Sequence, residues 1–314
     1  MRCYIHGLCM ALKEPVQVVI NAGAGAVDKE KIVNRLVERY LPKGSRWKVS
    51  VARNGPELLE LARRAVRDGY QTIVAGGGDG TVSTVAGVLA GTRKTLGVLP
   101  LGTLNHFAKD LQLPLDLDGA METIMAGHTV QVDVGDVNGQ TFINNSSLGL
   151  YPRIVKQREK QQRLGWGKWP AFVWAAFSVL RRYPLLDVRL SLNGKQLARR
   201  TPFVFIGNNA YEMEGFNIGR RTCLDKGELS LYITHRTGRM GLLRLALRAL
   251  LGGLRNEKDF MVLCTREIWI KTRHRRVHVA FDGETTIMKP PLHYHIRPGA
   301  LRVLAPDRVN EKVQ

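Results

Sequence analysis

The chain has 314 residues and a formal net charge of +20. This length exceeds the size at which one hydrophobic core usually stops growing, so it predicts two domains, and the four scattered cysteines exclude a disulfide scaffold. Residues 151–314 carry 31 Lys and Arg against 13 Asp and Glu, whereas residues 1–150 carry 16 against 14, so the charge predicts a polyanionic partner for the second half.

The N-terminal part of the chain predicts an α/β domain, which we place at residues 15–130. Short β-branched runs alternate there with helical stretches, as in parallel strands joined by crossover helices. One helix has clear start signals, since Asn54 supplies an N-cap, Pro56 a first-turn proline and Glu57 a capping-box acid. The strand candidates are Val16–Ile20, Trp47–Val51, Thr72–Ala75 and Leu96–Leu99.

A glycine-rich loop, Gly76 to Thr81, follows the third predicted strand. Consecutive glycines let backbone N–H groups approach a polyphosphate, and the helix that follows presents its positive N-terminus. The loop is not a Walker A sequence, because no lysine follows it, and it lacks the GxGxxG spacing of a dinucleotide fold. By itself it is compatible with a phosphate site or with a tight strand-to-helix turn.

Two other loops of small and polar residues follow predicted strands. Residues 99–105 come after the fourth strand, and Asn21 to Gly25 come after the first. The carboxyl ends of parallel strands meet at one edge of a sheet, where open α/β folds bind their ligands. Three such loops at one edge favour a ligand site over three unrelated connectors.

After about Asn145 the sequence predicts a second domain, an antiparallel β-sandwich, which we place at residues 131–304. We expect the last residues, 305–314, to pack back on the first domain. One helix is predicted within the second domain, at Met240 to Leu254. The hairpin dipeptides are Asn138-Gly139, Asn193-Gly194 and Asp282-Gly283, and the strand candidates are Val132–Val137, Thr141–Asn144, Asp187–Leu192, Pro202–Ile206, Glu228–Thr234, Glu267–Lys271 and Arg276–Phe281.

Residues 163–182 combine an apolar stretch with flanking Trp, Lys and Arg, as membrane-docking segments do. The apolar run has 12 residues, short of the roughly 20 that a spanning helix needs, so we expect no membrane crossing. A core helix would have the same pattern, but the basic charge favours docking at an anionic membrane surface. A nucleic acid is not expected as a partner, because no recognisable reading module accompanies the charge.

Together these motifs resemble the diacylglycerol kinase catalytic family, which includes sphingosine kinases and soluble bacterial lipid kinases. Gly-Gly-Asp-Gly-Thr alone also occurs in NAD kinases and phosphofructokinases, so the specificity lies in the order of the whole set, which spans nearly the entire chain. The resemblance implies a Rossmann-like first domain of the NAD kinase and diacylglycerol kinase type. The segments that carry it are Gly77–Thr81, Pro100–Ala108, Val132–Gly135 and Phe281–Glu284.

The resemblance implies a cytoplasmic, peripherally membrane-associated lipid kinase of phospholipid biosynthesis. It would transfer the γ-phosphoryl group of ATP to a lipid hydroxyl, with a diacylglycerol-like lipid as the expected substrate. Asp282 would be the general base that accepts the hydroxyl proton, while Mg²⁺ offsets charge on the phosphates. Without the resemblance, Asp282 would be interpreted as a hairpin turn residue, because Asp-Gly is a common turn dipeptide.

The resemblance also implies the ligand-binding residues. Asp79 and Asp133 would hold the catalytic Mg²⁺ through water, since this ion commonly keeps several waters. A separate structural Mg²⁺ would take the side chain of Asp225 and the carbonyls of Cys223 and Glu228. The implied nucleotide-binding residues are Asn21, Gly25, Gly77, Gly78, Asp79, Gly80, Thr81, Thr84, Thr103 and Asn105.

Four residues depart from the family pattern. His106 stands where an acid is usual, Ser83-Thr84 replaces Asn-Glu, and Ala22 replaces a proline. The two lost carboxylates motivate one alternative, a nucleotide-binding, membrane-associated regulator without catalysis. The shared glycine loop motivates another, a kinase of a soluble substrate such as NAD, which the Asp-Gly-Glu context disfavours.

Overall fold

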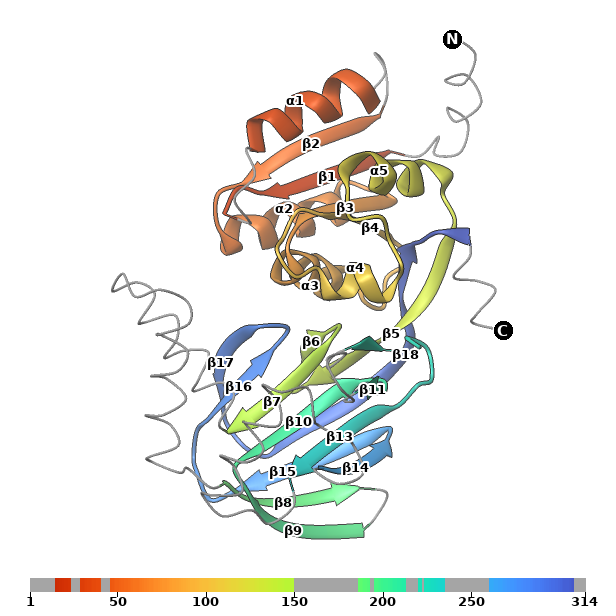
Figure 1. Cartoon of the computed structure of the whole chain (residues 1–314). Helices are drawn as coiled ribbons and strands as arrows, with labels where there is room; N and C mark the ends of the chain where they lie inside the picture. Colours follow the sequence, from red (N-terminus) through yellow and green to blue (C-terminus); the bar gives the residue numbers. More distant parts are fainter. Residues whose placement is uncertain are drawn as a thin grey trace, which may run out of the picture. The chain divides into compact units, whose positions relative to one another are not determined.

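The structure is a computed structural model (Figure 1). It describes residues 15–23, 29–40, 46–149, 186–192, 195–212, 220–221, 223–234 and 260–307. The predicted helix at 240–254, the predicted docking segment at 163–182 and the Asn193-Gly194 turn lie outside these residues. The chain forms two compact units. Unit 1 comprises residues 1–134, 223–225 and 298–314, and unit 2 comprises residues 135–222 and 226–297.

The sheet of unit 1 is parallel and has the strand order β2-β1-β3-β4 (Figure 1). Every residue of β3 and β4 is buried, which explains why the sequence shows continuous apolar runs there rather than an alternating pattern. The end of β18 (Leu292–Leu304) continues the sheet, with Arg302 opposite Thr95 in parallel register. The other strands are β1 (Val16–Asn21), β2 (Trp47–Ala52), β3 (Thr72–Gly77) and β4 (Thr95–Pro100).

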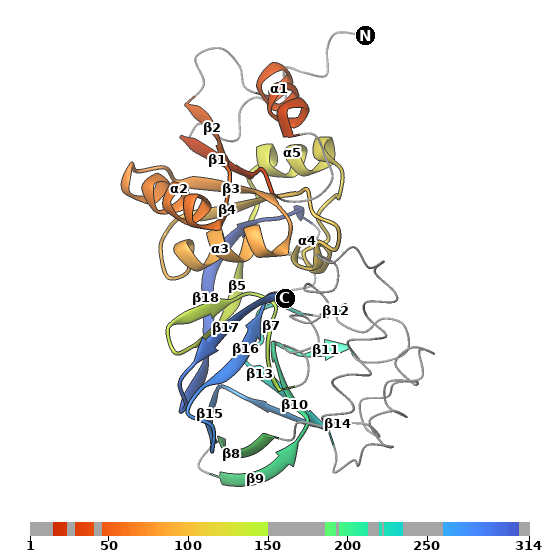
Figure 2. The ribbon, with the colours of Figure 1, turned by 90° about the vertical axis from the view of Figure 1, so that its left-hand side faces the viewer.

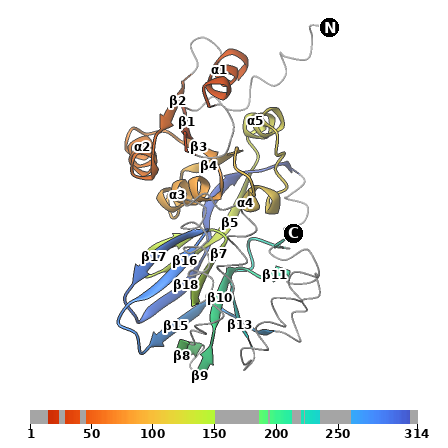
Figure 3. The ribbon, with the colours of Figure 1, turned by 60° about the vertical axis from the view of Figure 1, so that its left-hand side comes forward.

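Helices cover both faces of this sheet (Figures 2 and 3). Helices α1 (Lys29–Tyr40) and α5 (Leu117–Ala126) share one apolar cluster with β1, while α2 (Gly55–Arg67) and α3 (Asp79–Leu89) lie on the other face. The predicted start of α2 is confirmed, because Asn54 Oδ1 accepts the N–H of Glu57 at 2.9 Å. A short helix, α4 (His106–Asp110), follows β4.

Unit 2 consists of antiparallel strands in two layers. Six strands follow the order β14-β13-β10-β7-β16-β17, and the remaining strands include β8, β9, β15 and the first part of β18. One apolar core joins the layers, since Leu148, Val204 and Leu231 of the six-stranded sheet pack in the same cluster as Val188 and Ile270 of the other. The predicted combination of a parallel α/β part and an antiparallel β part is therefore confirmed.

Unit 2 contains the strands from β5 to β17 and the first part of β18. They are β5 (Thr129–Val137, which begins in unit 1), β6 (Gln140–Phe142), β7 (Asn145–Gly149), β8 (Leu186–Leu192), β9 (Lys195–Thr201), β10 (Phe203–Asn208), β11 (Tyr211–Glu212), β12 (Arg220–Arg221), β13 (Leu229–Thr234), β14 (Phe260–Thr265), β15 (Glu267–Thr272), β16 (Val277–Phe281) and β17 (Glu284–Met288).

Candidate active site

The glycine loop of unit 1 is tighter than its sequence suggests. Strand β3 ends at Gly77, Gly78 is the N-cap of α3, and Asp79 already begins the helix. Gly78 has no side chain to cap the helix, so the first-turn N–H groups of α3 keep their positive end toward the loop. Such an N-terminus is suited to a phosphate group.

Two glycines allow close packing here, Gly77 against α3 and Gly102 against the β3 loop. A Cβ on Gly77 would lie 2.3 Å from Thr81 Oγ1, and a Cβ on Gly102 would lie 2.4 Å from the Cα of Gly78. The N–H of Leu101 donates to the carbonyl of Gly77 at 3.0 Å, which joins the two loops through their backbones. Any side chain at Gly102 would separate them.

The first loop joins the same cluster. Asn21 Nδ2 donates to Thr81 Oγ1 at 3.0 Å, and Asn21 Oδ1 accepts the N–H of Gly23 at 3.0 Å. The structure thus brings the ends of β1, β3 and β4 together, as expected for parallel strands. Gly25 lies outside the described residues.

Asn105 shapes the β4 loop from within. It is buried, with a left-handed φ of 51°, and its Oδ1 accepts the N–H of Gly102 at 3.1 Å. Its Nδ2 donates to the carbonyls of Pro100 at 3.2 Å and Gly102 at 2.9 Å. These bonds use the side chain to close the turn and leave Thr103 exposed at its tip.

Two polar side chains of α3 already have intramolecular partners. Asp79 Oδ1 accepts the N–H of Phe107 at 3.2 Å, so this carboxylate caps α4. Thr84 Oγ1 donates to the carbonyl of Gly80 at 2.8 Å, one turn back in α3. The sequence assigned both residues to ATP, and the structure shows that each also supports the local fold.

Asp133 is buried at the unit 1 end of β5, with a side chain that is 2% exposed. Its Oδ1 accepts the N–H of Gly299 at 2.8 Å, and its own N–H donates to the carbonyl of Leu224 at 2.8 Å. The carboxylate therefore holds β18 to β5. Gly299 was not identified from the sequence, because nothing local indicates its partner.

The structural metal site stays a prediction. Asp225 is exposed in unit 1, and in unit 2 the carbonyl of Glu228 accepts the N–H of Asn209 at 2.9 Å. Cys223 is half-buried. Among the residues that the structure describes, no three His, Cys, Asp or Glu side chains gather as a metal-binding group.

In unit 2, Asp282 lies at the turn of the β16–β17 hairpin. Its φ is 47° and that of Gly283 is 86°, the two positive values of a type I′ turn. The Asp282 side chain is only 7% exposed. Its carboxylate accepts three consecutive backbone N–H groups, from Ile143 at 2.7 Å, Asn144 at 2.8 Å and Asn145 at 3.1 Å. Three such donors stabilise the charged form of a carboxylate.

Arg221 binds the same segment through oxygen atoms of Ile143 and Asn144. The side chain is buried, and its Nη1 donates to the carbonyls of Ile143 at 2.7 Å and Asn208 at 3.2 Å. Its Nη2 donates to Asn144 Oδ1 at 2.9 Å. A buried cation and a buried anion are thus linked through one strand end, which satisfies both. The sequence did not single out Arg221 among its many arginines.

Glu284 follows this turn, and the surroundings of the turn change its pKa. Loss of solvent around the hairpin, and then the nearby negative charge of Asp282, raise the pKa of Glu284 above its ordinary value. Within the described residues, no helix has the length and apolarity to cross a membrane.

Two family descriptions match the chain in sequence. Residues 15–137 match the diacylglycerol kinase catalytic domain, and residues 151–305 match the YegS C-terminal NAD kinase beta sandwich-like domain. Proteins named diacylglycerol kinase from Staphylococcus aureus strains JH9 and Newman are 30% identical over 186 residues. That match covers 58% of this chain and 58% of the length of those relatives.

The fold itself is shared with a solved structure. A diacylglycerol kinase from Bacillus anthracis strain Sterne superimposes with a TM-score of 0.71 at 23% identity. The superposition covers 94% of this chain and 98% of that one. Both halves of the predicted architecture are therefore present in one known fold.

Proposed function

Because the chain belongs to the diacylglycerol kinase catalytic family, we propose that it transfers the γ-phosphoryl group of ATP to the hydroxyl of a diacylglycerol-like lipid. The observation that supports this best is the joining of three strand-end loops through Asn21, Thr81 and the Gly78–Gly102 contact. Glycines at these positions place backbone rather than side chains where phosphates would approach.

In this proposal the α3 N-terminus holds the ATP phosphates. Gly78 and the first N–H groups of the helix, those of Asp79 and Gly80, have no capping side chain, whereas the N–H of Thr81 donates to the Gly78 carbonyl at 2.9 Å. Thr103 is exposed on the neighbouring loop and supplies a hydroxyl to the nucleotide. Asn105 contributes indirectly, by fixing the shape of its turn.

The donor set suits a magnesium ion that keeps most of its waters. Asp79 uses one carboxylate oxygen for Phe107 N–H, which leaves Oδ2 for a metal-bound water, and Asp133 supplies a second buried carboxylate. Mg²⁺ is commonly held by one or two carboxylates together with substrate phosphates. When bound, the ion would neutralise charge on the transferred phosphoryl group.

Asp282 orients the lipid hydroxyl and accepts its proton. The oxygen of the hydroxyl forms the new bond to the γ-phosphorus, the bond to the ADP oxygen breaks, and the proton passes to the carboxylate. Oδ1 accepts two N–H groups and Oδ2 accepts one. These bonds fix the orientation in which the carboxylate meets the hydroxyl.

The test is direct phosphoryl transfer. The purified chain is incubated with γ-labelled ATP, Mg²⁺ and a total lipid extract, and in parallel with NAD. We expect label in a lipid phosphate. Label in NAD alone would replace the lipid proposal with a soluble substrate.

A non-catalytic regulator is the second candidate. This candidate is favoured by Thr84, which stands where the family usually has an acid. Its hydroxyl donates to the Gly80 carbonyl within the helix. His106, where a second acid is usual, is exposed. A chain that binds ATP and anionic vesicles, yet labels no lipid in the extract, would support this candidate over the kinase.

A further inference from the structure

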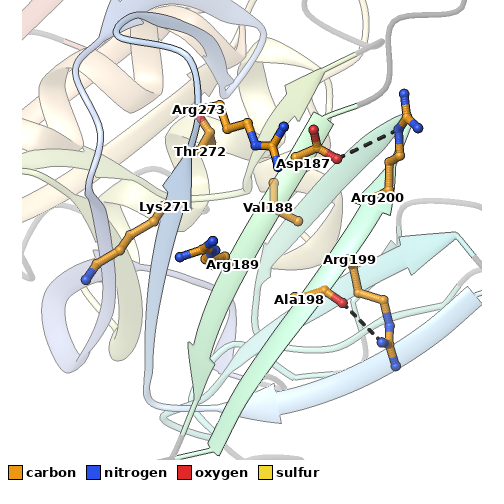
Figure 4. A pocket seen from close by; sticks show the side chains of 9 residues that line it. All are labelled: Asp187, Val188, Arg189, Ala198, Arg199, Arg200, Lys271, Thr272 and Arg273. Carbon is orange, nitrogen blue, oxygen red and sulfur yellow. Dashed lines mark hydrogen bonds and ion pairs between the residues drawn. The ribbon is translucent and has the colours of Figure 1, made fainter.

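Unit 2 has a basic cavity on the sheet formed by β8, β9 and β15. Alternate residues of β8, Leu186, Val188 and Leu190, are buried in the core, so the residues between them face outward. A cavity of about 490 Å³ opens here (Figure 4). Its lining includes five cations and one carboxylate, namely Arg189, Arg199, Arg200, Lys271, Arg273 and Asp187.

Two of these cations face each other across neighbouring strands. Lys271 of β15 lies directly opposite Arg189 of β8 in antiparallel register. Directly opposite residues share a face of the sheet, and like charges in such a pair destabilise it. Neither side chain has an ion-pair partner among the described residues. Folding alone does not explain this pair, whereas an anion held between the two cations would convert repulsion into attraction.

The single carboxylate of the cavity does not neutralise that pair. Asp187 Oδ1 lies 3.7 Å from Arg200 Nε, and Figure 4 shows the Asp187 side chain joined to Arg200. Ala198 is the residue of β9 directly opposite Arg189. Its short side chain leaves space beside the guanidinium, so a ligand can enter where a larger residue would fill the face.

An aromatic side chain lies next to the cations on the same face. Trp269 is two residues before Lys271 on β15, and it is 37% exposed. It stacks on His293 with ring centroids 3.9 Å apart, and its Nε1 donates to Glu267 at 2.7 Å. An anchored, exposed tryptophan beside Lys and Arg is typical of surfaces that meet lipid headgroups.

We propose that this cavity binds the phosphate group of an anionic phospholipid headgroup, and that this face of unit 2 attaches the chain to a membrane. Arg189 and Lys271 hold the phosphate between them, Arg273 adds charge, and Trp269 lies at the level of the headgroups. The proposal deepens the proposed function, because it rests on a lipid substrate that the enzyme must reach at a bilayer surface.

The test compares two substitutions with the same change in charge. Arg189→Glu places an acid opposite Lys271, and Arg93→Glu makes the same change on an exposed turn of unit 1. Binding is measured by co-sedimentation with vesicles of equimolar phosphatidylcholine and phosphatidylglycerol, and with phosphatidylcholine alone. We expect Arg189→Glu to weaken binding to the anionic vesicles by roughly an order of magnitude or more. Arg93→Glu should bind like the wild type, and neutral vesicles should bind poorly.

A second readout is specific to the opposed cations. Because opposite charges across a strand pair stabilise a sheet, Arg189→Glu should raise the melting temperature while it weakens vesicle binding. Lys271→Glu should have the same two effects. Arg189→Glu that binds anionic vesicles as tightly as Arg93→Glu would overturn the proposal.

Competition identifies the source of the phosphate. Inorganic phosphate at millimolar concentration should compete weakly. The lipid assignment would be overturned if inorganic phosphate displaced the vesicles as effectively as excess anionic vesicles do. It would also be overturned if Arg189→Glu lost binding to duplex DNA but kept binding to vesicles. Kinase activity on lipid in neutral detergent micelles is measured separately, so failure of the kinase proposal and failure of this surface give different results.

Discussion

Replacing Asp282 by Asn tests how the hairpin turn is held. Asparagine tolerates the positive φ of this position as well as aspartate does, so the backbone is not strained. It has one acceptor oxygen instead of two, however. With that oxygen at the Oδ1 position, the bonds from Asn144 and Asn145 persist, but the amide NH₂ then faces the N–H of Ile143.

The cost follows from that geometry. One buried N–H left without an acceptor costs about 1–3 kcal/mol, and each retained bond loses roughly 1 kcal/mol when its acceptor is no longer charged. We therefore expect Asp282→Asn to lower the free energy of unfolding of unit 2 by about 3–5 kcal/mol. Loss of turnover in this variant is thus not evidence of catalysis unless folding is measured beside it.

The measurement is urea unfolding, with amide hydrogen exchange at Ile143, Asn144 and Asn145 to localise the effect. Asp68→Asn is the matched control, because Asp68 is exposed at the end of α2 and its carboxylate pairs with Arg64 at 3.5 Å. The control should change stability by less than about 0.5 kcal/mol. If Asp282→Asn is as stable as the control and its three amides stay equally protected, the hydrogen-bond argument is refuted.

Three other variants test separate parts of the chain. Gly102→Ala should lower stability by about 1–3 kcal/mol and weaken ATP binding, because its Cβ meets the Gly78 backbone at 2.4 Å. Gly55→Ala is the control: a Cβ there has no atom within 4 Å, so neither the melting temperature nor nucleotide binding should change. Burial, and then the hydrogen bond to Asp118, raise the pKa of Tyr40 to about 12 from 10.0. Its contribution to stability is therefore complete below pH 10 and is lost as the pH rises to about 12, a loss that Tyr40→Phe should remove from melting curves. Arg221→Ala should cost about 3–5 kcal/mol in urea unfolding, since it leaves buried carbonyls and the Asp282 charge uncompensated; a loss below about 1 kcal/mol would contradict this.

Local signals predicted the α/β part of the fold well. Buried parallel strands produce apolar runs, so β1, β3 and β4 lie within two residues of their predicted bounds. The cap at Asn54 depends only on neighbours three residues away. Strand β18 was missed, because Pro298 and Gly299 within it indicate a break when only the sequence is considered.

The candidate site was predicted where it depends on strand ends and missed where it depends on distant partners. The glycine loop, Asn21 and Thr81 follow from the rule that parallel strands end at one edge. No local pattern connects Arg221 to the Ile143 carbonyl, 78 positions away. Side chains of this kind are identified only when the fold shows which buried backbone groups need a partner.

The way Asp282 is held fits the chemistry proposed for it. In phosphoryl transfer the transition state is largely dissociative, so the attacking hydroxyl needs orientation and a nearby charge more than early removal of its proton. Three N–H donors and the type I′ turn fix the Asp282 carboxylate in position, and Arg221 fixes those donors in turn. A residue that could be only a turn former is therefore also one that can present a charged oxygen with little freedom, and the two roles support each other.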